Sequence, residues 1–224
     1  MRHRNRAVDR VGGALVQAGI DHFDRLEQDA LHHIHRLRSR YTARTRFGRW
    51  IRTLSIPDGM GRCLFALVRA LRPKTCLELG TGVGISAAYI TAALAMNGKG
   101  SLWTLDRDAD RLTLARQHLR LLPWRVPCHF VQGPFSRTFG KTLQELGAID
   151  FGFIDDEHTV QAVRRRLPKL LKALRPGGIL VYDDLPWSPH TVLSWRHIQR
   201  SRAVGLALDC GRFGIVLPNA LRAH

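Results

Sequence analysis

The sequence predicts an α/β fold: a doubly wound, mostly parallel sheet that closes with an antiparallel C-terminal hairpin. Short apolar runs alternate with amphipathic segments from residue 57 onward, and this alternation is typical of a parallel sheet covered by helices on both faces. A glycine-rich turn, Gly80-Thr81-Gly82-Val83-Gly84, joins the first apolar run to a helical segment. The last two runs, 204–209 and 213–217, flank Gly211-Arg212, which predicts a hairpin instead of another crossover.

Hydrophobic periodicity defines the individual elements. The helix expected over 158–174 contains Pro168, whose ring must bend this helix or lie near its start. The charged residues 164–166 and Lys169 of the same helix are expected to point largely outward. With the hairpin, the sheet has seven strands. The other strands are expected over 75–79, 101–105, 127–131, 149–154 and 178–182, and the helices over 61–71, 85–97, 108–121, 158–174 and from after Ser188 to about 198.

A basic N-terminal extension, residues 1–53, precedes the α/β domain, residues 54–224. Apolar positions at helical spacing predict one or two amphipathic helices within residues 8–40, with Phe23, Leu26, Ala30, Ile34 and Leu37 facing inward. Asp21 is the expected N-cap of the second helix, with Asp24 in the capping-box position. This segment packs on the main domain or on a second copy of the chain, so a homodimer is one possible assembly.

The charge of the chain is strongly basic but unevenly distributed. The formal net charge is +17, and residues 54–160 hold 12 basic and 10 acidic residues, so the excess lies on either side of the glycine-rich region. Such a field attracts nucleic acid, anionic lipid or an acidic substrate, or it is simply a solvated surface. No recognised RNA-binding signature accompanies it.

Composition limits the compartment and the redox chemistry. No apolar run approaches the ~20 residues that span a bilayer, and the basic start lacks a secretory apolar stretch, so a cytoplasmic location is expected. The four cysteines are scattered singly, as is typical of buried thiols in a reducing compartment.

The glycine turn indicates a nucleotide-like ligand, because the backbone can approach it closely and the following helix offers free N–H groups. The glycine spacing is Gly-x-Gly-x-Gly, and Glu78 lies at the end of the preceding strand. A carboxylate there suits a cationic sulfonium ligand and its ammonium group better than a pyrophosphate. Both details favour S-adenosylmethionine over a dinucleotide.

Over residues 55–217 the chain resembles the class I S-adenosylmethionine-dependent methyltransferases, which have a Rossmann-like fold. Leu77–Gly84 resembles their first motif, Asp106 the acid that holds the ribose hydroxyls, and residues 151–155 and 174–180 two later motifs. The resemblance implies a set of residues that contact the cofactor. These are Glu78, Gly80, Thr81, Gly82, Gly84, Ser86, Asp106, Arg107, Gly133, Phe135 and Asp155.

Within that class the chain resembles bacterial small-molecule O-methyltransferases of the catechol and caffeoyl-CoA type. Residues 55–61, 155–158 and 182–187 look like their entry segment and two acid-rich stretches. In metal-dependent members a divalent cation such as Mg²⁺ orients neighbouring substrate hydroxyls, and the resemblance implies Asp155, Asp183 and Asp184 as its ligands. Asp184 stands where the family usually has Asn. Acids at strand ends also cap helices or touch cofactor, so both interpretations stay open.

Departures from the family pattern affect the catalytic assignment. Gly133-Pro134-Phe135 stands where the family often has Gly-Asp-Ala, and no lysine follows Asp155. His158 is therefore the nearest candidate base beside Asp155, because imidazole titrates near neutrality, and His190 is a weaker candidate. Trp187 is expected to form an apolar wall against the acceptor.

The sequence thus predicts an S-adenosylmethionine-dependent enzyme that methylates an oxygen of a small molecule, with or without a divalent metal. Two alternatives remain at this point. One is an RNA or DNA methyltransferase that uses the basic flanks, and the other is a non-catalytic subunit that binds S-adenosylmethionine.

Overall fold

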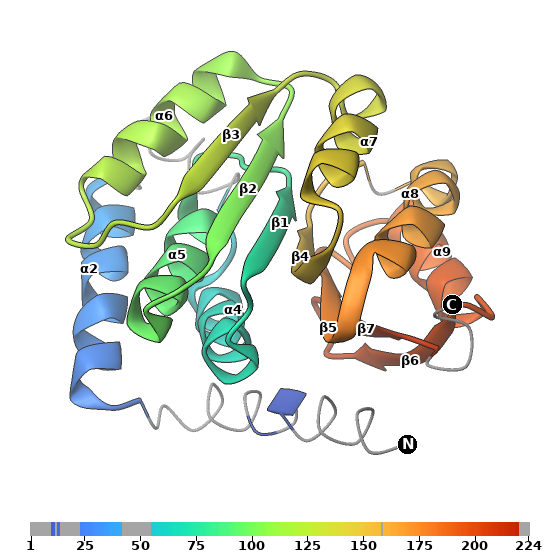
Figure 1. Cartoon of the computed structure of the whole chain (residues 1–224), viewed down its shortest axis with the longest axis horizontal. Coiled ribbons are helices and arrows are strands. Elements are labelled where there is room, and N and C mark those ends of the chain that lie inside the picture. Colours follow the sequence, from blue (N-terminus) through green and yellow to red (C-terminus); the bar gives the residue numbers. More distant parts are fainter. Residues whose placement is uncertain (1–9, 12, 14–22, 42–54, 158, 220–224) are drawn as a thin grey trace.

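Seven strands form one sheet in the order β3-β2-β1-β4-β5-β7-β6, shown in the computed structural model (Figure 1). The structure describes residues 10–11, 13, 23–41, 55–157 and 159–219. The strands are β1 (Thr75–Leu79), β2 (Ser101–Asp106), β3 (Cys128–Gln132), β4 (Ile149–Ile154), β5 (Leu174–Tyr182), β6 (Val204–Asp209) and β7 (Gly214–Pro218). The helices are α2 (Arg25–Tyr41), α4 (Asp58–Leu71), α5 (Ile85–Asn97), α6 (Ala109–Arg120), α7 (Phe135–Leu146), α8 (Val160–Ala173) and α9 (Pro189–Gln199).

The strand pairing confirms the predicted topology. Strands β1 to β5 pair in parallel, and β7 pairs antiparallel with both β5 and β6. The chain winds from β1 outward to β3 and then returns to place β4 on the other side of β1. In sheets of this kind ligands bind at the carboxyl ends of the strands where the winding direction reverses. The candidate site therefore lies beyond the ends of β1 and β4.

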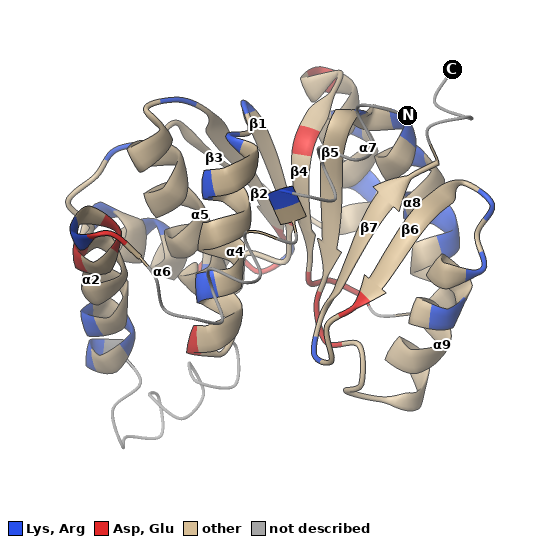
Figure 2. Ribbon diagram, turned by 90° about the horizontal axis from the view of Figure 1, so that it is seen from below, with Lys and Arg blue, Asp and Glu red and all other residues tan. Residues whose placement is uncertain are grey.

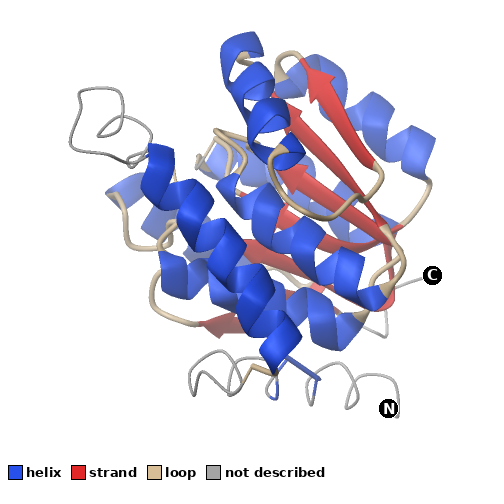
Figure 3. Cartoon of the chain, turned by 90° about the vertical axis from the view of Figure 1, so that its left-hand side faces the viewer, coloured by secondary structure: helices blue, strands red, loops and turns tan. Residues whose placement is uncertain are grey.

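Each face of the sheet has its own hydrophobic core. Alternate strand residues point to opposite faces, so Cys76 joins the cluster formed with α2, α4 and α5, whereas Leu77 joins the cluster formed with α7, α8 and α9. Figure 3 shows the helices on both sides of the strands. This burial on both faces explains why the strands read as continuous apolar runs.

Helix α7 was not predicted from the sequence. Its buried residues Phe135, Phe139 and Leu143 recur every four positions, as on one helical face. Gly140 and the threonines around it have low helix propensity. This helix is therefore stabilised mainly by packing of its aromatic face on the sheet.

The N-terminal helix differs from the expectation in two details. Its cap is a box formed by Asp24 and Glu27, in which each backbone N–H donates to the other side chain at 2.8–3.2 Å; Asp21 lies outside the described residues. Leu26 is 70% exposed, so its expected inward position is wrong. Glu27 is instead buried and forms an ion pair with Arg69 of α4 at 2.8 Å, which joins this helix to the α/β domain.

Helix α8 contains Pro168 in its interior and begins after the Thr159 cap, whose side chain accepts the Ala162 N–H. The expectation that the three arginines point outward is wrong for Arg166, which is 7% exposed. Its guanidinium has acidic partners in the loop before the helix, and these compensate the charge. All four cysteines are free thiols, but only Cys76 is buried as expected, whereas Cys63, Cys128 and Cys210 are partly exposed. Among the described helices, none has the length and apolarity needed to span a membrane.

Candidate functional site

The glycine turn lies against the end of β4. Gly80 has φ +96, and a Cβ on it would overlap the carbonyl oxygen of Asp155. The Asp155 N–H donates in turn to the Leu79 carbonyl at 2.8 Å. A glycine is required here because any side chain would push the turn away from β4. The cofactor-side turn and the acid-bearing end of β4 are therefore in direct contact.

A buried chain of polar groups supports this turn from inside the sheet. Thr104 of β2 donates to the Glu78 carboxylate at 2.5 Å, and its hydroxyl lies 2.5 Å from the Thr81 hydroxyl. All three side chains are almost completely buried. Thr81, predicted as a cofactor contact, therefore holds the turn through its side chain. Thr104 was missed because a threonine inside a strand carries no motif signal.

Glu78 has an unusual protonation equilibrium. Burial raises its pKa to about 8, hydrogen bonds from Ser86 and Thr104 oppose the rise, and the charges of Asp155 and Asp106 add to it. Its Oε1 atom is buried and has no hydrogen-bond partner within the described chain. An orphaned buried carboxylate oxygen is costly unless a ligand supplies a donor. The residue therefore suits a ligand that carries N–H groups, and its contact with the cofactor stays a prediction.

Asp106 is positioned at the end of β2, as predicted, but its oxygens are already used. Oδ2 accepts the Gly82 N–H at 2.9 Å and Oδ1 accepts the Asp108 N–H at 3.0 Å. A carboxylate has about four lone-pair sites, so each oxygen can still accept a ribose hydroxyl. Asp106 thus orients the glycine turn as well as presenting acceptors to a ligand. Arg107, the next residue, is exposed.

The loop after β3 places an aromatic ring beside the same region. The Gly133 N–H donates to the Asp106 carbonyl at 3.0 Å, which fixes the loop to the end of β2. Phe135 begins α7 and is 9% exposed. The Arg166 guanidinium lies 5.2 Å from the centre of its ring and also pairs with Asp156 and Glu157. Arg166 thus connects α8, α7 and the loop after β4.

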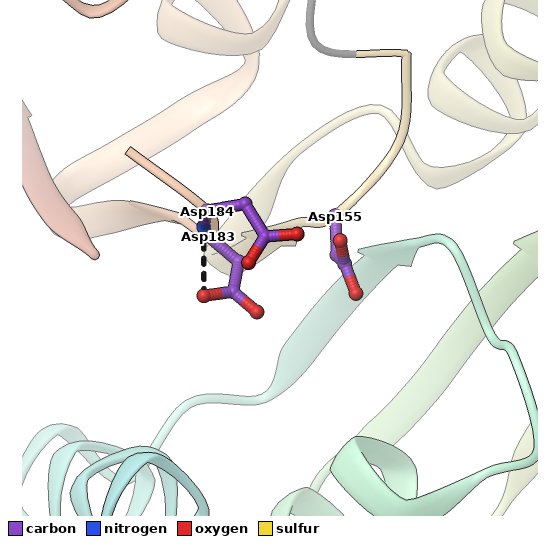
Figure 4. A group of neighbouring side chains, drawn as sticks. All are labelled: Asp155, Asp183 and Asp184. Atoms are coloured by element: carbon purple, nitrogen blue, oxygen red, sulfur yellow. Dashed lines mark hydrogen bonds between the residues drawn. The ribbon is translucent and has the colours of Figure 1, made fainter. Parts of the chain in front are cut away.

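The ends of β4 and β5 bring three carboxylates together (Figure 4). Asp155, Asp183 and Asp184 each offer an oxygen, and these oxygens lie within 4.8 Å of one another. The Asp183 N–H donates to the Ile154 carbonyl at 3.0 Å, which holds the two strand ends side by side. This is the juxtaposition that the resemblance predicted. That a metal ion binds there stays a prediction.

The hairpin turn between β6 and β7 adds a cation to this acidic cluster. Arg212 Nε lies 3.3 Å from Asp183 Oδ1, and Nη2 lies 2.7 Å from Asp184 Oδ1. In Figure 2 the basic turn between β6 and β7 lies beside the acidic segment that follows β5. The sequence pattern predicted Arg212 only as part of a hairpin turn. No motif links it to residues about thirty positions earlier.

The Asp183 carboxylate is the most buried member of the cluster, with 1% of its side chain exposed. Burial raises its pKa to about 6, with further contributions from the charges of Asp155 and Asp184, while Arg212 and the Asp184 N–H oppose the rise. Its Oδ1 accepts that N–H at 2.8 Å. Oδ2 has no hydrogen-bond partner in the described structure, so one oxygen is left for a ligand.

Comparison with known proteins agrees with this geometry. Residues 77–185 match the family model described as a methyltransferase domain. Residues 77–185 are thus identified as a methyltransferase domain. The matched segment begins in β1 and ends just after β5. It therefore includes the glycine turn, Asp106, Phe135 and all three carboxylates. The resemblance to class I methyltransferases predicted from the sequence is confirmed.

Individual relatives of this methyltransferase domain are distant. A caffeoyl-CoA O-methyltransferase of Populus kitakamiensis is 25% identical over 136 residues, and tapetum-specific methyltransferase 1 of Arabidopsis thaliana is 27% identical over 135. Each alignment covers 60% of this chain and 56% of the relative, so the chain spans little more than half the length of these relatives. The SAH-bound methyltransferase PaMTH1 of Podospora anserina has the same fold, with a TM-score of 0.67 at 18% identity over 85% of this chain and 88% of that one.

The candidate residues on the acceptor side of the methyltransferase domain have different environments. His158, the predicted base, lies outside the described residues, and the alternative His190 is exposed on the first turn of α9. Trp187 is 74% exposed in the loop between β5 and α9. The Trp187 backbone N–H donates to the Asp184 carbonyl at 3.2 Å, so the exposed ring lies near the acidic cluster, and its role as a wall stays a prediction.

Proposed function

We propose that this protein is an S-adenosylmethionine-dependent O-methyltransferase that acts on a hydroxyl group of a small molecule. The contact between Gly80 and Asp155 is the observation that carries the proposal. It joins the cofactor half of the site, at the ends of β1 and β2, to the acidic half, at the ends of β4 and β5. Methyl transfer requires the donor and the acceptor oxygen to be held in line at short distance.

The cofactor half is assigned to residues of the glycine turn and its neighbours. Glu78 accepts N–H donors of the cofactor through its orphaned Oε1, and Asp106 accepts the ribose hydroxyls. Phe135 packs against the adenine. When bound, S-adenosylmethionine supplies the activated methyl group; the protein supplies position and a path for the proton.

The acceptor half orients and deprotonates the hydroxyl. Asp183 Oδ2 faces no donor of its own in the described chain, so it is suited to accept the hydrogen bond of an acceptor O–H. Asp155 and His158 are the other proposed proton acceptors. The similarity to caffeoyl-CoA O-methyltransferase supports an aromatic hydroxyl compound as the class of acceptor. This proposal does not depend on a divalent ion.

A binding titration tests the cofactor half. We expect Asp106→Asn to weaken S-adenosylmethionine binding by about 10-fold or more, as for loss of a charge-assisted hydrogen bond worth about 1.5–3 kcal/mol. Asp110→Asn, an exposed acid of the first turn of α6, is the matched control and should leave the affinity unchanged. Equal affinity in both variants and the wild type would remove Asp106 from the cofactor site.

Transfer of tritium from methyl-labelled cofactor to a library of phenols tests the whole proposal. Labelled product extractable into organic solvent is the expected result. If the label enters only RNA or DNA, the nucleic-acid alternative replaces the proposal. If the cofactor binds but no compound of a cell extract or of the phenol library becomes labelled, the protein is a non-catalytic binding subunit.

A further inference from the structure

The antiparallel register of the sheet places Arg212 opposite the acidic cluster. Leu180 pairs with Val216 and Tyr182 with Gly214, and the same register continued by two residues sets Arg212 against Asp184. The Leu185 N–H donates to the Arg212 carbonyl at 2.8 Å, which extends the pairing past the end of β5. The position of Arg212 is therefore set by strand pairing and not by chance contact of a flexible side chain.

The turn that carries Arg212 is itself closed by hydrogen bonds. The Cys210 N–H donates to the Phe213 carbonyl at 2.9 Å, and the Gly211 N–H donates to the Asp209 side chain at 2.9 Å. Gly211 has φ +83, a conformation that glycine adopts without strain. The backbone beneath the guanidinium is thus well defined.

The guanidinium lies against one oxygen of each of two carboxylates in the acidic cluster. Arg212 Nε lies 3.3 Å from Asp183 Oδ1, which also accepts the Asp184 N–H, and Arg212 Nη2 lies 2.7 Å from Asp184 Oδ1. A divalent cation would have to displace this side chain or bind beside its positive charge. Two positive centres at such short range repel each other strongly in a partly buried site.

Asp184 contributes a second observation. It stands where the family usually has a neutral Asn, and it adopts φ +56, a left-handed conformation that Asn and Asp tolerate best after glycine. The extra negative charge at this position lies 2.7 Å from the Arg212 guanidinium, so the two charges compensate each other.

We propose that the Arg212 guanidinium is the resident cation of this site and takes the place of the divalent metal ion of related enzymes. It orders Asp183 and Asp184 and attracts the oxygen of the acceptor as negative charge develops on it. The Arg212 side chain is 37% exposed, so part of it can be reached by an acceptor. This role rests on the proposed methyl transfer, and the exclusion of metal can be measured without it.

Binding of Mn²⁺, followed by electron paramagnetic resonance of the free ion, tests the proposal in the full-length protein. We expect the wild type to bind Mn²⁺ at least about 10-fold more weakly than Arg212→Met, in which the repulsion is removed. A second variant, Arg212→Met with Asp184→Asn, has the ligand set usual in the family and should also bind the ion more tightly than the wild type. Arg175→Met is the matched control: this arginine pairs with Asp150 at 3.1 Å, near the opposite ends of the strands, and its loss should not change Mn²⁺ binding.

The outcomes separate this inference from the proposed function. Equal Mn²⁺ affinity in the wild type and Arg212→Met, whether tight or weak, would overturn the role of Arg212. So would wild-type methyl transfer that is lost on chelation and restored by Mg²⁺. S-adenosylmethionine binding and tritium transfer are measured in parallel, so a failure of the proposed function appears there while the Mn²⁺ comparison remains interpretable. Circular dichroism of each variant checks that it is folded.

Discussion

The Thr104 hydroxyl donates a 2.5 Å hydrogen bond to the buried carboxylate of Glu78, so that β2 and β1 are joined by a buried polar contact. This contact places a titratable group at the base of the glycine turn. Because burial raises the pKa of that group to about 8, its protonation is coupled to the stability of the domain.

The first prediction concerns the pH dependence of stability. The pKa of about 8 keeps Glu78 protonated in the folded state up to that pH, whereas the unfolded chain releases the proton near the ordinary pKa of 4.5. The free energy of unfolding should therefore decrease from pH 5 to pH 8, by about 1.4 kcal/mol per pH unit at most from this group. The free energy of unfolding measured by urea denaturation should depend less on pH in Glu78→Gln than in the wild type. Glu145→Gln, an exposed acid of α7, should keep the wild-type slope; a wild-type slope in Glu78→Gln would contradict the prediction.

The second prediction concerns the contact between the glycine turn and β4. In Gly80→Ala the new Cβ overlaps the Asp155 carbonyl, and the alanine backbone must also adopt φ +96. Gly98→Ala has a similar positive φ, +67, but no atom within 4 Å of the new Cβ. We expect a loss of about 1 kcal/mol for the control, from the left-handed conformation alone, and several kcal/mol for Gly80→Ala. Thermal unfolding of both variants measures the difference, and equal losses would contradict the overlap.

The third prediction concerns the buried guanidinium of α8. Arg166→Met removes the guanidinium that pairs with Asp156, whose side chain is 5% exposed. The expected loss is about 3–5 kcal/mol of unfolding free energy, and a second change, Asp156→Asn, should recover part of it. Arg165→Met, the exposed neighbour, should change stability by less than about 0.5 kcal/mol. No recovery in the double variant would show that packing on Phe135, and not charge, is what Arg166 provides.

The fourth prediction concerns the acceptor side. Trp187 is 74% exposed, so Trp187→Ala should alter stability by no more than about 0.5 kcal/mol. If the ring packs on the acceptor, KM for a phenol should rise several-fold while S-adenosylmethionine affinity stays constant. Leu26→Ala, which removes an equally exposed apolar side chain from α2, is the control. Unchanged steady-state kinetics in Trp187→Ala would exclude it from the acceptor pocket.

Local sequence patterns were sufficient for the elements whose pattern has a single interpretation. Ile85–Asn97 was predicted at its observed bounds, because a glycine turn and a following Gly98 mark both ends. Helix α7 was missed, because its glycine and threonines obscure a short aromatic face. The outward position of Arg166 was wrong for a related reason: helical periodicity places a residue on a face but does not reveal which acids lie against that face.

By itself the sequence determined the fold class, the glycine turn and the strand-end acids, because hydrophobic period, glycine spacing and chain order are local properties. It placed Glu78, Asp106, Asp155 and Asp183 at strand ends, where a parallel sheet gathers its ligands. Only the tertiary structure decided what surrounds them. Thr104 under Glu78 and Arg212 against Asp184 come from pairings across the sheet, and register between distant strands is set by packing, which no single segment encodes.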